Sequence, residues 1–290
     1  MCRCQISSMS LVGAIDSRGY FEAKRRNFSY LSIELSIFSS LHSSGKLSER
    51  SARSLRSTLT IVLITIQTFK LVLSLMLKVT QTILDDIEGK GWSSFSTSKH
   101  SLDNLFEVLG HIIMETDVLI DRKSRPLVTS AEGLSPHTDH HLAHYILWHC
   151  IVQDSCGGHS IIVDGLNVFR SMNPETQEVL RHINLMEHSI FKNDLEYHSM
   201  ISETSLGDRI YYPILFNPTE FWLAGKRLTK EQKQAFNNFN EAVRDTKPIL
   251  LKLEPGECLV VDNGRILHGR TPLSNNSDRL LKRYWFGDSL

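Results

Sequence analysis

Two histidines and one aspartate in this chain have the types and spacing of a metal site assembled from distant segments. His137 and Asp139 form a His-x-Asp motif, and His268 follows far along the chain. Two histidine nitrogens and one carboxylate oxygen on one face of an octahedral metal leave three adjacent positions open, which suits non-haem Fe(II). Because residues i and i+2 of an extended strand point to the same side, we expect His137 and Asp139 to present their ligand atoms together.

Two arginines near the carboxyl end could bind an anion beside such a metal. Arg279 opens the segment Arg-Leu-Leu-Lys-Arg-Tyr-Trp, and Arg283 lies four residues further on. A co-substrate with two carboxylates needs a counter-charge at its far end, and the planar guanidinium group matches a carboxylate. We expect Arg283 on the same strand face as Arg279, either supporting this contact or engaged in a structural ion pair.

These residues give the chain a resemblance to a known family. From about Ser101 to Asp288 it resembles the taurine dioxygenase superfamily of 2-oxoglutarate oxygenases, which includes γ-butyrobetaine and trimethyllysine hydroxylases and clavaminate synthase-like hydroxylases. The family pattern is His-x-Asp/Glu, a long interval, a distal His often followed by Gly-Arg, and then an Arg. Here the distal element is His-Gly-Arg at 268–270. A family segment Gly-Gly-x-Thr/Ser is matched by Gly-Gly-His-Ser at 157–160.

The resemblance implies a fold and a metal. The fold is mainly β, with a double-stranded β-helix (jelly roll) core and flanking and inserted helices. The metal is Fe(II), bound by His137, Asp139 and His268, which are then also the catalytic residues.

The resemblance also implies an activity. It assigns Arg279, Ser160 and Arg283 to the binding of 2-oxoglutarate, which is a co-substrate together with O2. The protein is then an oxidoreductase, a 2-oxoglutarate-dependent dioxygenase. It would hydroxylate a small molecule of the amino acid, betaine or sulfonate type, with release of succinate and CO2.

Two alternatives concern the same residues. Few residues separate Asp85 from His137 compared with family members, so a catalytically degenerate member acting as a binding or structural protein is an alternative. A di-zinc hydrolase needs a further His two positions before His137, where Ser135 stands. The sequence therefore disfavours the hydrolase.

Short strand signals predict the elements that position these residues. They are apolar or β-branched runs bounded by turn residues: Val118–Ile120, Leu127–Thr129, Ala143–Val152, His159–Val163, Arg209–Phe216, Ile249–Leu253, Cys258–Asp262 and Leu280–Phe286. Pro255-Gly256 predicts a turn. Many short strands with inserted helices are typical of a closed or sandwiched β architecture.

Capping residues predict three helices among these strands. Ser101 suits the N-cap of a short helix that Gly110 ends. Pro174 suits the first turn of a helix over Pro174–Ile183, and Thr229 caps a helix over Thr229–Thr246.

Composition divides the chain at about residue 84. Residues 1–84 contain eleven Lys and Arg against four Asp and Glu, and residues 85–290 contain 21 against 28. The first region is also rich in Ser and has no Pro. We therefore expect an N-terminal extension over 1–84, partly disordered, and the dioxygenase domain over 85–290.

Charge and apolar runs indicate partners and location. The formal net charge of zero gives no reason to expect nucleic acid as a partner. Leu59–Leu77 approaches the length of a membrane span. Gln67 and Lys70 make insertion costly, so a buried amphipathic helix and membrane association through this segment both stay open. The five cysteines lack a regular spacing and suggest free thiols in a reducing, cytoplasmic compartment. The expected partner is a small-molecule substrate, and a homo-oligomer is left open.

Overall fold

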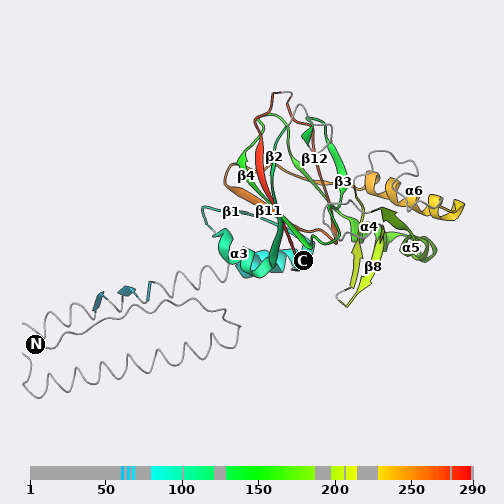
Figure 1. Ribbon diagram of the computed structural model, residues 1–290, viewed down its shortest axis with the longest axis horizontal. Helices are drawn as coiled ribbons and strands as arrows, with labels where there is room; N and C mark the ends of the chain where they lie inside the picture. The colour runs from blue at the N-terminus through cyan, green and yellow to red at the C-terminus, as the bar shows by residue number, and fades with distance from the viewer. Residues whose placement is uncertain are drawn as a thin grey trace, which may run out of the picture. The chain divides into compact units, whose positions relative to one another are not determined.

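The computed structural model of this protein describes residues 60–61, 64–65, 67–68, 80–99, 101–120, 129–186, 197–205, 207–213, 228–274 and 276–288 (Figure 1). By its contacts the chain divides into two units, Met1–Val72 and Leu73–Leu290. The described residues between 60 and 68 are helical. Most of the expected N-terminal extension lies outside the described residues, as do much of Leu59–Leu77 and part of Leu127–Thr129. In the described part of the chain, no helix combines the length and apolar character needed to span a bilayer.

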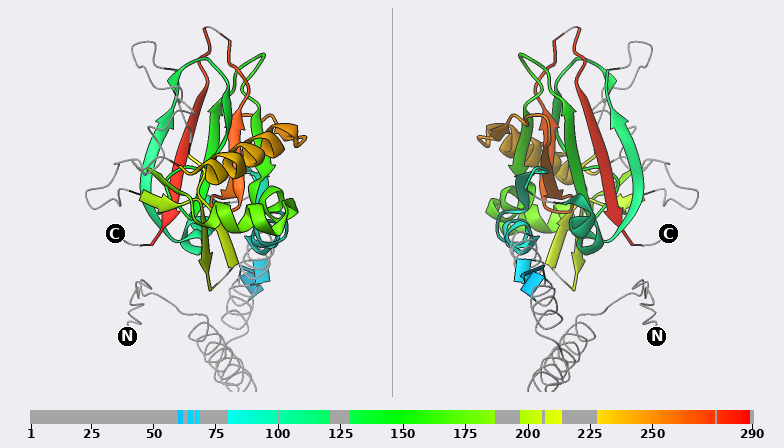
Figure 2. Two further views of the ribbon diagram at one scale, coloured as in Figure 1. Left: turned by 90° about the vertical axis from the view of Figure 1, so that its right-hand side faces the viewer. Right: turned by 90° about the vertical axis from the view of Figure 1, so that its left-hand side faces the viewer.

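Two antiparallel sheets form the core of the second unit (Figure 2). The five-stranded sheet has the order β1 (Trp92–Ser96), β11 (Glu257–Asp262), β4 (Tyr145–Val152), β13 (Leu280–Gly287) and β2 (His111–Val118). The four-stranded sheet has the order β10 (Ile249–Leu251), β5 (Ser160–Asp164), β12 (Ile266–Arg270) and β3 (Leu134–His137). Two small two-stranded sheets pair β6 (Asn184–Met186) with β7 (Tyr197–Ser199) and β8 (Ile201–Thr204) with β9 (Gly207–Ile210).

The inner faces of the two large sheets pack against each other. One buried cluster combines Ile146 of β4 and Leu281 of β13 with Ile162 of β5 and Ile266 of β12, so it draws on both sheets. The residues next to these along each strand point to the outer face of their sheet, because successive side chains of a strand alternate between its two faces. Leu147 joins a different cluster beneath the helices, for example. The result is a layered β core whose interior lies between the sheets.

Helices cover the outer faces of the sheets (Figure 1). Residues 80–90 and α3 (Leu102–Leu109) pack on the five-stranded sheet. A third cluster joins α4 (Gly165–Ser171), α5 (Pro174–Arg181) and α6 (Lys230–Asp245) to the four-stranded sheet and the hairpins. The helix at 80–90 crosses the expected division at residue 84.

Local capping signals predict the helices well. The Ser101 hydroxyl accepts a hydrogen bond from the backbone N–H of Asp103. At the other end of the helix, the backbone N–H of Gly110 donates to the carbonyl oxygen of Phe106. Thr229 forms a complete capping box with Gln232 at the start of α6. These predictions are confirmed because a cap needs only residues within one turn.

Several strand predictions need correction. The strand expected at Val118–Ile120 is β2, and it runs back from Val118 to His111. β2 is an edge strand with no fully buried residue, and a register shift at Ile113 interrupts the alternation of its side chains, so its sequence gives a weak strand signal. The strand expected at Arg209–Phe216 ends at Ile210, and its last residues lie outside the described part. Three of the cysteines, Cys150, Cys156 and Cys258, are described, and all are free.

Candidate metal centre

Two neighbouring strands bring the two histidines together. His137 is the last residue of β3, and His268 lies in the middle of β12. The antiparallel register pairs these two residues directly, and their ring centroids lie 4.4 Å apart. Cross-strand partners project to the same face of a sheet. Both imidazoles therefore face the interior between the sheets, where His137 and His268 are 4% and 7% exposed.

Asp139 completes the cluster from the loop after β3. Its Oδ1 lies 3.7 Å from Nε2 of His137 and 3.7 Å from Nε2 of His268. One ligand atom from each of the three residues lies within 4.8 Å of the others. The expectation that Asp139 shares an extended strand with His137 is wrong, because β3 ends at His137. Convergence depends on how the following loop is held.

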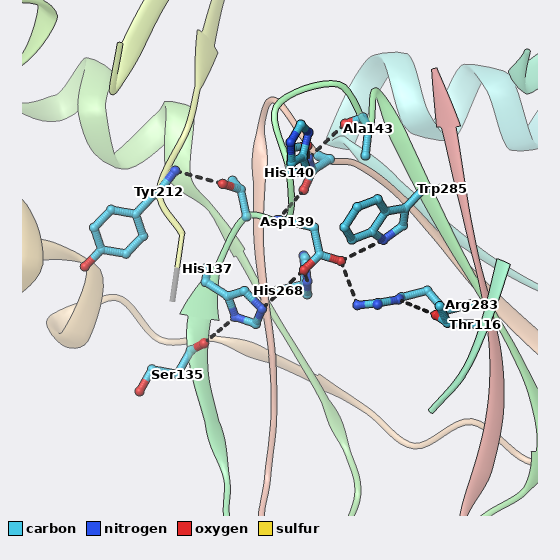
Figure 3. A network of polar contacts seen from close by, with 12 residues as sticks. Thr116, Ser135, His137, Asp139, His140, Ala143, Tyr212, His268, Arg283 and Trp285 are labelled. Carbon is cyan, nitrogen blue, oxygen red and sulfur yellow. Dashed lines mark hydrogen bonds and ion pairs between the residues drawn. The ribbon is translucent and has the colours of Figure 1, made fainter. Parts of the chain in front are cut away.

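Hydrogen bonds from two sides hold this loop (Figure 3). The backbone N–H of Asp139 donates to Oδ1 of Asn263 at 2.8 Å, and the buried Asn263 amide donates to the carbonyl oxygens of His140 and Ala143. On the other side, the backbone N–H of Tyr212 donates to the Thr138 hydroxyl at 2.7 Å. Asn263, which follows β11, thus anchors the aspartate.

The second oxygen of Asp139 is bound by two donors from β13. Nη1 of Arg283 and Nε1 of Trp285 lie 3.0 Å and 2.9 Å from Oδ2 (Figure 3). Burial alone raises the pKa of this carboxyl, but the positive charge of Arg283, followed by His268, holds the pKa well below its usual range. Asp139 is therefore an anion at neutral pH.

His137 presents an uncharged nitrogen to the centre. Burial, followed by the charge of His268, lowers the pKa of His137 to about 3. Nδ1 of His137 lies 2.8 Å from the carbonyl oxygen of Ser135. Because a carbonyl only accepts, Nδ1 carries the proton and Nε2 keeps a lone pair toward Asp139. This is the protonation state that a metal requires of a histidine ligand.

A cavity of about 50 Å³ beside the imidazoles of His137 and His268 is lined by the expected anion-binding residues. Ser160 at the start of β5, Arg279 just before β13, and Arg270 and Arg283 all line it. Arg279 is 4% exposed, and no carboxylate of the described residues forms an ion pair with it. A buried guanidinium without a counter-ion is costly, which is a reason to expect an anionic ligand here.

Neutral groups fix the orientation of Arg279. Its Nε donates to Oε1 of Gln153 at 3.1 Å, and its Nη2 lies 3.5 Å from the carbonyl oxygen of Gly158. Burial, and next the charge of Arg270, lowers the pKa of Arg279 to about 10, so it remains a cation at neutral pH. Gln153 is a site residue that the sequence does not indicate, because an isolated Gln at the end of a strand carries no recognisable signal.

The structure brings all six expected site residues to one region. His137, Asp139 and His268 form the cluster, and Arg279 and Ser160 line the adjoining cavity. Arg283 also lines the cavity, but its Nη1 pairs with Asp139. Its expected contact with a co-substrate stays a prediction.

Comparisons with known proteins agree with this arrangement. The chain is 30% identical over 152 residues to human gamma-butyrobetaine dioxygenase and, to the same degree, to that of Pongo abelii. These matches cover 47% of this chain and 39% of each relative, so the chain spans about two fifths of the relatives' length.

Solved structures share the fold at low sequence identity. The non-heme iron oxygenase OrfP, in complex with Fe and alpha-ketoglutaric acid, superposes with a TM-score of 0.57 at 15% identity, over 76% of this chain and 83% of that one. An asparagine oxygenase in complex with Fe(II), 2S,3S-3-hydroxyasparagine and succinate gives 0.50 at 15% identity, over 62% and 61%. The mostly antiparallel sheets with a few helices therefore match the fold of these oxygenases.

A family model extends the agreement to most of the described domain. The model described as "Taurine catabolism dioxygenase TauD, TfdA family" matches residues 95–285. This range runs from β1 to β13 and contains the metal cluster, the Gly-Gly-His-Ser segment at 157–160, and Arg279 and Arg283. The chain belongs to this TauD, TfdA family of dioxygenases.

Proposed function

We propose that this protein is an Fe(II)- and 2-oxoglutarate-dependent dioxygenase that hydroxylates a small molecule. The observation that carries the proposal is the convergence of His137, Asp139 and His268 beside a cavity lined by the buried Arg279. Two imidazole nitrogens and one carboxylate oxygen are the donor set that suits Fe(II) with open positions. Bonds of about 2 Å place metal ligands within about 4 Å of one another, so binding would draw these side chains slightly together.

Each residue has a role that its surroundings support. Fe(II), when bound, would supply the activation of O2 that protein side chains lack. His137, Asp139 and His268 would hold it. Arg279 would bind the far carboxylate of 2-oxoglutarate, since its cationic fork is buried without a carboxylate partner in the described chain. The hydroxyl of Ser160, which also lines the cavity, would donate a hydrogen bond to that carboxylate.

The fold and domain division that accompany this function are also proposals. The five-stranded and four-stranded sheets packed around one interior support a double-stranded β-helix, or jelly roll, as the finer description of the core. Residues 85–290 would form the dioxygenase domain, and residues 1–84 an extension. The cytoplasmic location and a homo-oligomer stay predictions from the sequence.

Amino acids and betaines are the substrate classes to test first. The relatives are gamma-butyrobetaine dioxygenases, and the asparagine oxygenase of similar fold was solved with a hydroxylated amino acid. Sulfonates follow from the taurine catabolism in the family's name. The release of succinate and CO2 gives an assay that any of these substrates can use.

A turnover screen tests the proposal. The full chain is incubated with Fe(II), 2-oxoglutarate and O2 against amino acids, betaines and sulfonates, and succinate is measured. Asp139→Ala should abolish succinate formation, whereas Asp117→Ala, which removes an exposed carboxylate paired with Lys282, should leave it unchanged. Succinate formation that persists in Asp139→Ala would refute the assigned site.

The alternative of a degenerate member has a geometric expectation of its own. Two histidines more than roughly 5 Å apart, too far for one metal, would favour this alternative. The ligand atoms lie within 4.8 Å of one another, and the imidazole ring centroids lie 4.4 Å apart. The geometry therefore favours the enzyme over a protein with a lost metal site.

A further inference from the structure

Trp285 makes a hydrogen bond to the metal-site aspartate that the proposed function does not use. Its indole Nε1 donates to Oδ2 of Asp139 at 2.9 Å, and the side chain is 3% exposed. Trp285 lies two residues after Arg283 on β13, so both side chains project to the interior face. Both therefore meet the same carboxylate oxygen from one strand.

The indole is held in place by its own neighbours. The guanidinium carbon of Arg283 lies 4.9 Å from the ring centroid on one side, and the ring of His140 lies 6.2 Å away at an interplanar angle of 28°. Arg283 is in turn bonded through Nε to the Thr116 hydroxyl of β2 at 3.2 Å. Packing thus sets the direction of the indole N–H before any ligand arrives.

Arg283 and Trp285 make the two carboxylate oxygens of Asp139 inequivalent. Oδ2 accepts from Arg283 and Trp285, while Oδ1 lies 3.7 Å from each imidazole Nε2. A carboxylate offers about four lone-pair sites, and two on Oδ2 are already engaged. A carboxylate that bound through both oxygens would take one of the positions that the co-substrates need.

We propose that Trp285 is a positioning residue that presents Asp139 to the metal through Oδ1 alone. The proposal rests on the proposed function, because it assumes that His137, Asp139 and His268 hold a metal. Arg283 contributes charge as well as a hydrogen bond, so its replacement would change two properties. The indole N–H is neutral, and Trp285→Phe removes the donor while keeping an aromatic ring in the packed site.

Metal affinity is the first test. The metal-free full chain is titrated with Co²⁺ by calorimetry, and the unfolding midpoint of each metal-free variant is measured beside it. Trp285→Phe should weaken Co²⁺ binding by about 10- to 100-fold, the usual effect of losing a hydrogen bond to a metal ligand. The control Trp92→Phe, in β1 at the far edge of the same sheet, should change the affinity by less than about threefold.

The result separates this proposal from the proposed function. If the wild-type chain binds Co²⁺ through Asp139 and Trp285→Phe binds it equally well, the positioning role is overturned and the metal site stands. If the wild-type chain binds no Co²⁺, or binds it unchanged in Asp139→Ala, both proposals are overturned. A merely structural role would lower the unfolding midpoint and leave the affinity of the folded fraction unaltered, which also overturns the proposal.

A second measurement applies if Trp285→Phe does not fold. The wild-type chain is labelled with ¹⁵N-tryptophan, and the four indole signals are assigned by replacing the other tryptophans one at a time. The Trp285 N–H signal should shift in Asp139→Asn and on addition of Zn²⁺, because its acceptor changes in both. An indole signal that is insensitive to both changes would rule out the bond and with it the proposal.

Discussion

The arginines of the cavity illustrate how similar residues take different tasks. Arg283 is neutralised by Asp139, whereas the guanidinium group of Arg279 donates hydrogen bonds to the neutral oxygens of Gln153 and Gly158. Both are largely buried, so their environments, and not their exposure, distinguish them. A cation that the described chain leaves without a carboxylate is the better candidate for binding an anionic ligand.

The Arg279 assignment predicts a selective loss of co-substrate affinity. Arg279→Lys keeps the positive charge but loses the planar fork. Its KM for 2-oxoglutarate should rise by about 10- to 100-fold, since charge-assisted hydrogen bonds contribute about 1.5–3 kcal/mol each. Its affinity for Co²⁺ should stay within about threefold of the wild-type affinity, because no metal ligand is changed. Steady-state kinetics and calorimetry measure the two quantities. The control Arg244→Lys, on the exposed face of α6, should alter neither, and an unchanged KM for 2-oxoglutarate in Arg279→Lys would contradict the assignment.

Two loops must approach closely to place Arg279 at the cavity. The backbone N–H of Gly158 donates to the carbonyl oxygen of Pro272 at 3.2 Å. A Cβ on Gly157 would lie 1.9 Å from that same oxygen, a distance no side chain tolerates. Gly158 has a φ of +72°, which favours glycine. The backbone itself therefore requires the glycine pair.

Replacing Gly157 should destabilise the protein through this contact. Gly157→Ala should lower the free energy of unfolding by about 2–4 kcal/mol, because the opposing atom is backbone and cannot rotate away. Gly89→Ala provides the matched control, since nothing lies within 4 Å of its Cβ and residues 80–90 are helical. It should raise the free energy of unfolding by about 0.5–1 kcal/mol. Urea unfolding of both variants compares them directly, and equal effects would disprove the steric argument.

Asp154 connects the same two loops through its buried carboxylate. Its oxygens accept hydrogen bonds from the backbone N–H groups of Cys156 and Gly157 on one loop and of Ser274 on the other, and from the Ser274 hydroxyl. Burial raises the pKa of this carboxyl, but the hydroxyls of Ser274 and Ser277 and the two backbone groups outweigh burial and hold the pKa well below its ordinary value.

This depressed pKa predicts the pH dependence of stability. A carboxyl whose pKa is lower in the folded chain stabilises it above the unfolded pKa of about 3.9. That contribution is lost as pH falls toward the folded pKa. The wild-type chain should therefore exceed Asp154→Asn in free energy of unfolding at pH 7 and pH 5, and the difference should shrink at pH 3. Denaturant unfolding at the three pH values tests this, and a constant difference would contradict it.

At the scale of the whole molecule, the site exists only where the two sheets are assembled. His137 and His268 are neighbours through β3 and β12, while Arg283 and Trp285 reach Asp139 from the other sheet. The unfolded chain holds none of these groups together. A metal that binds the folded cluster therefore stabilises the fold itself.

Metal addition and removal should shift the thermal unfolding midpoint. Zn²⁺ at a concentration of about 100 times its Kd contributes about 2.7 kcal/mol, which for a domain of this size corresponds to about 5–10 °C. Chelation should reverse the shift. Asp139→Ala should show a shift of about 1 °C or less, because one of the three ligands is missing. Calorimetric scans with and without Zn²⁺ measure the effect, and an equal shift in this variant would place the bound metal elsewhere.

The sequence by itself identified the features that depend on few neighbouring residues or on a motif. The capped helices α3 and α6, the turn at Pro255-Gly256 and most central strands were predictable from local patterns. The six site residues were identified by type, order and family pattern, and they do gather in one region.

Only the tertiary structure decided how these residues are held. The loop position of Asp139, its anchoring by Asn263 and the bonds of its second oxygen to Arg283 and Trp285 join residues more than a hundred positions apart. The edge strand β2 was largely missed as well, because none of its residues is fully buried and a register shift at Ile113 interrupts its alternation. Local sequence specifies local backbone conformation, whereas the packing of the two sheets determines which distant side chains meet.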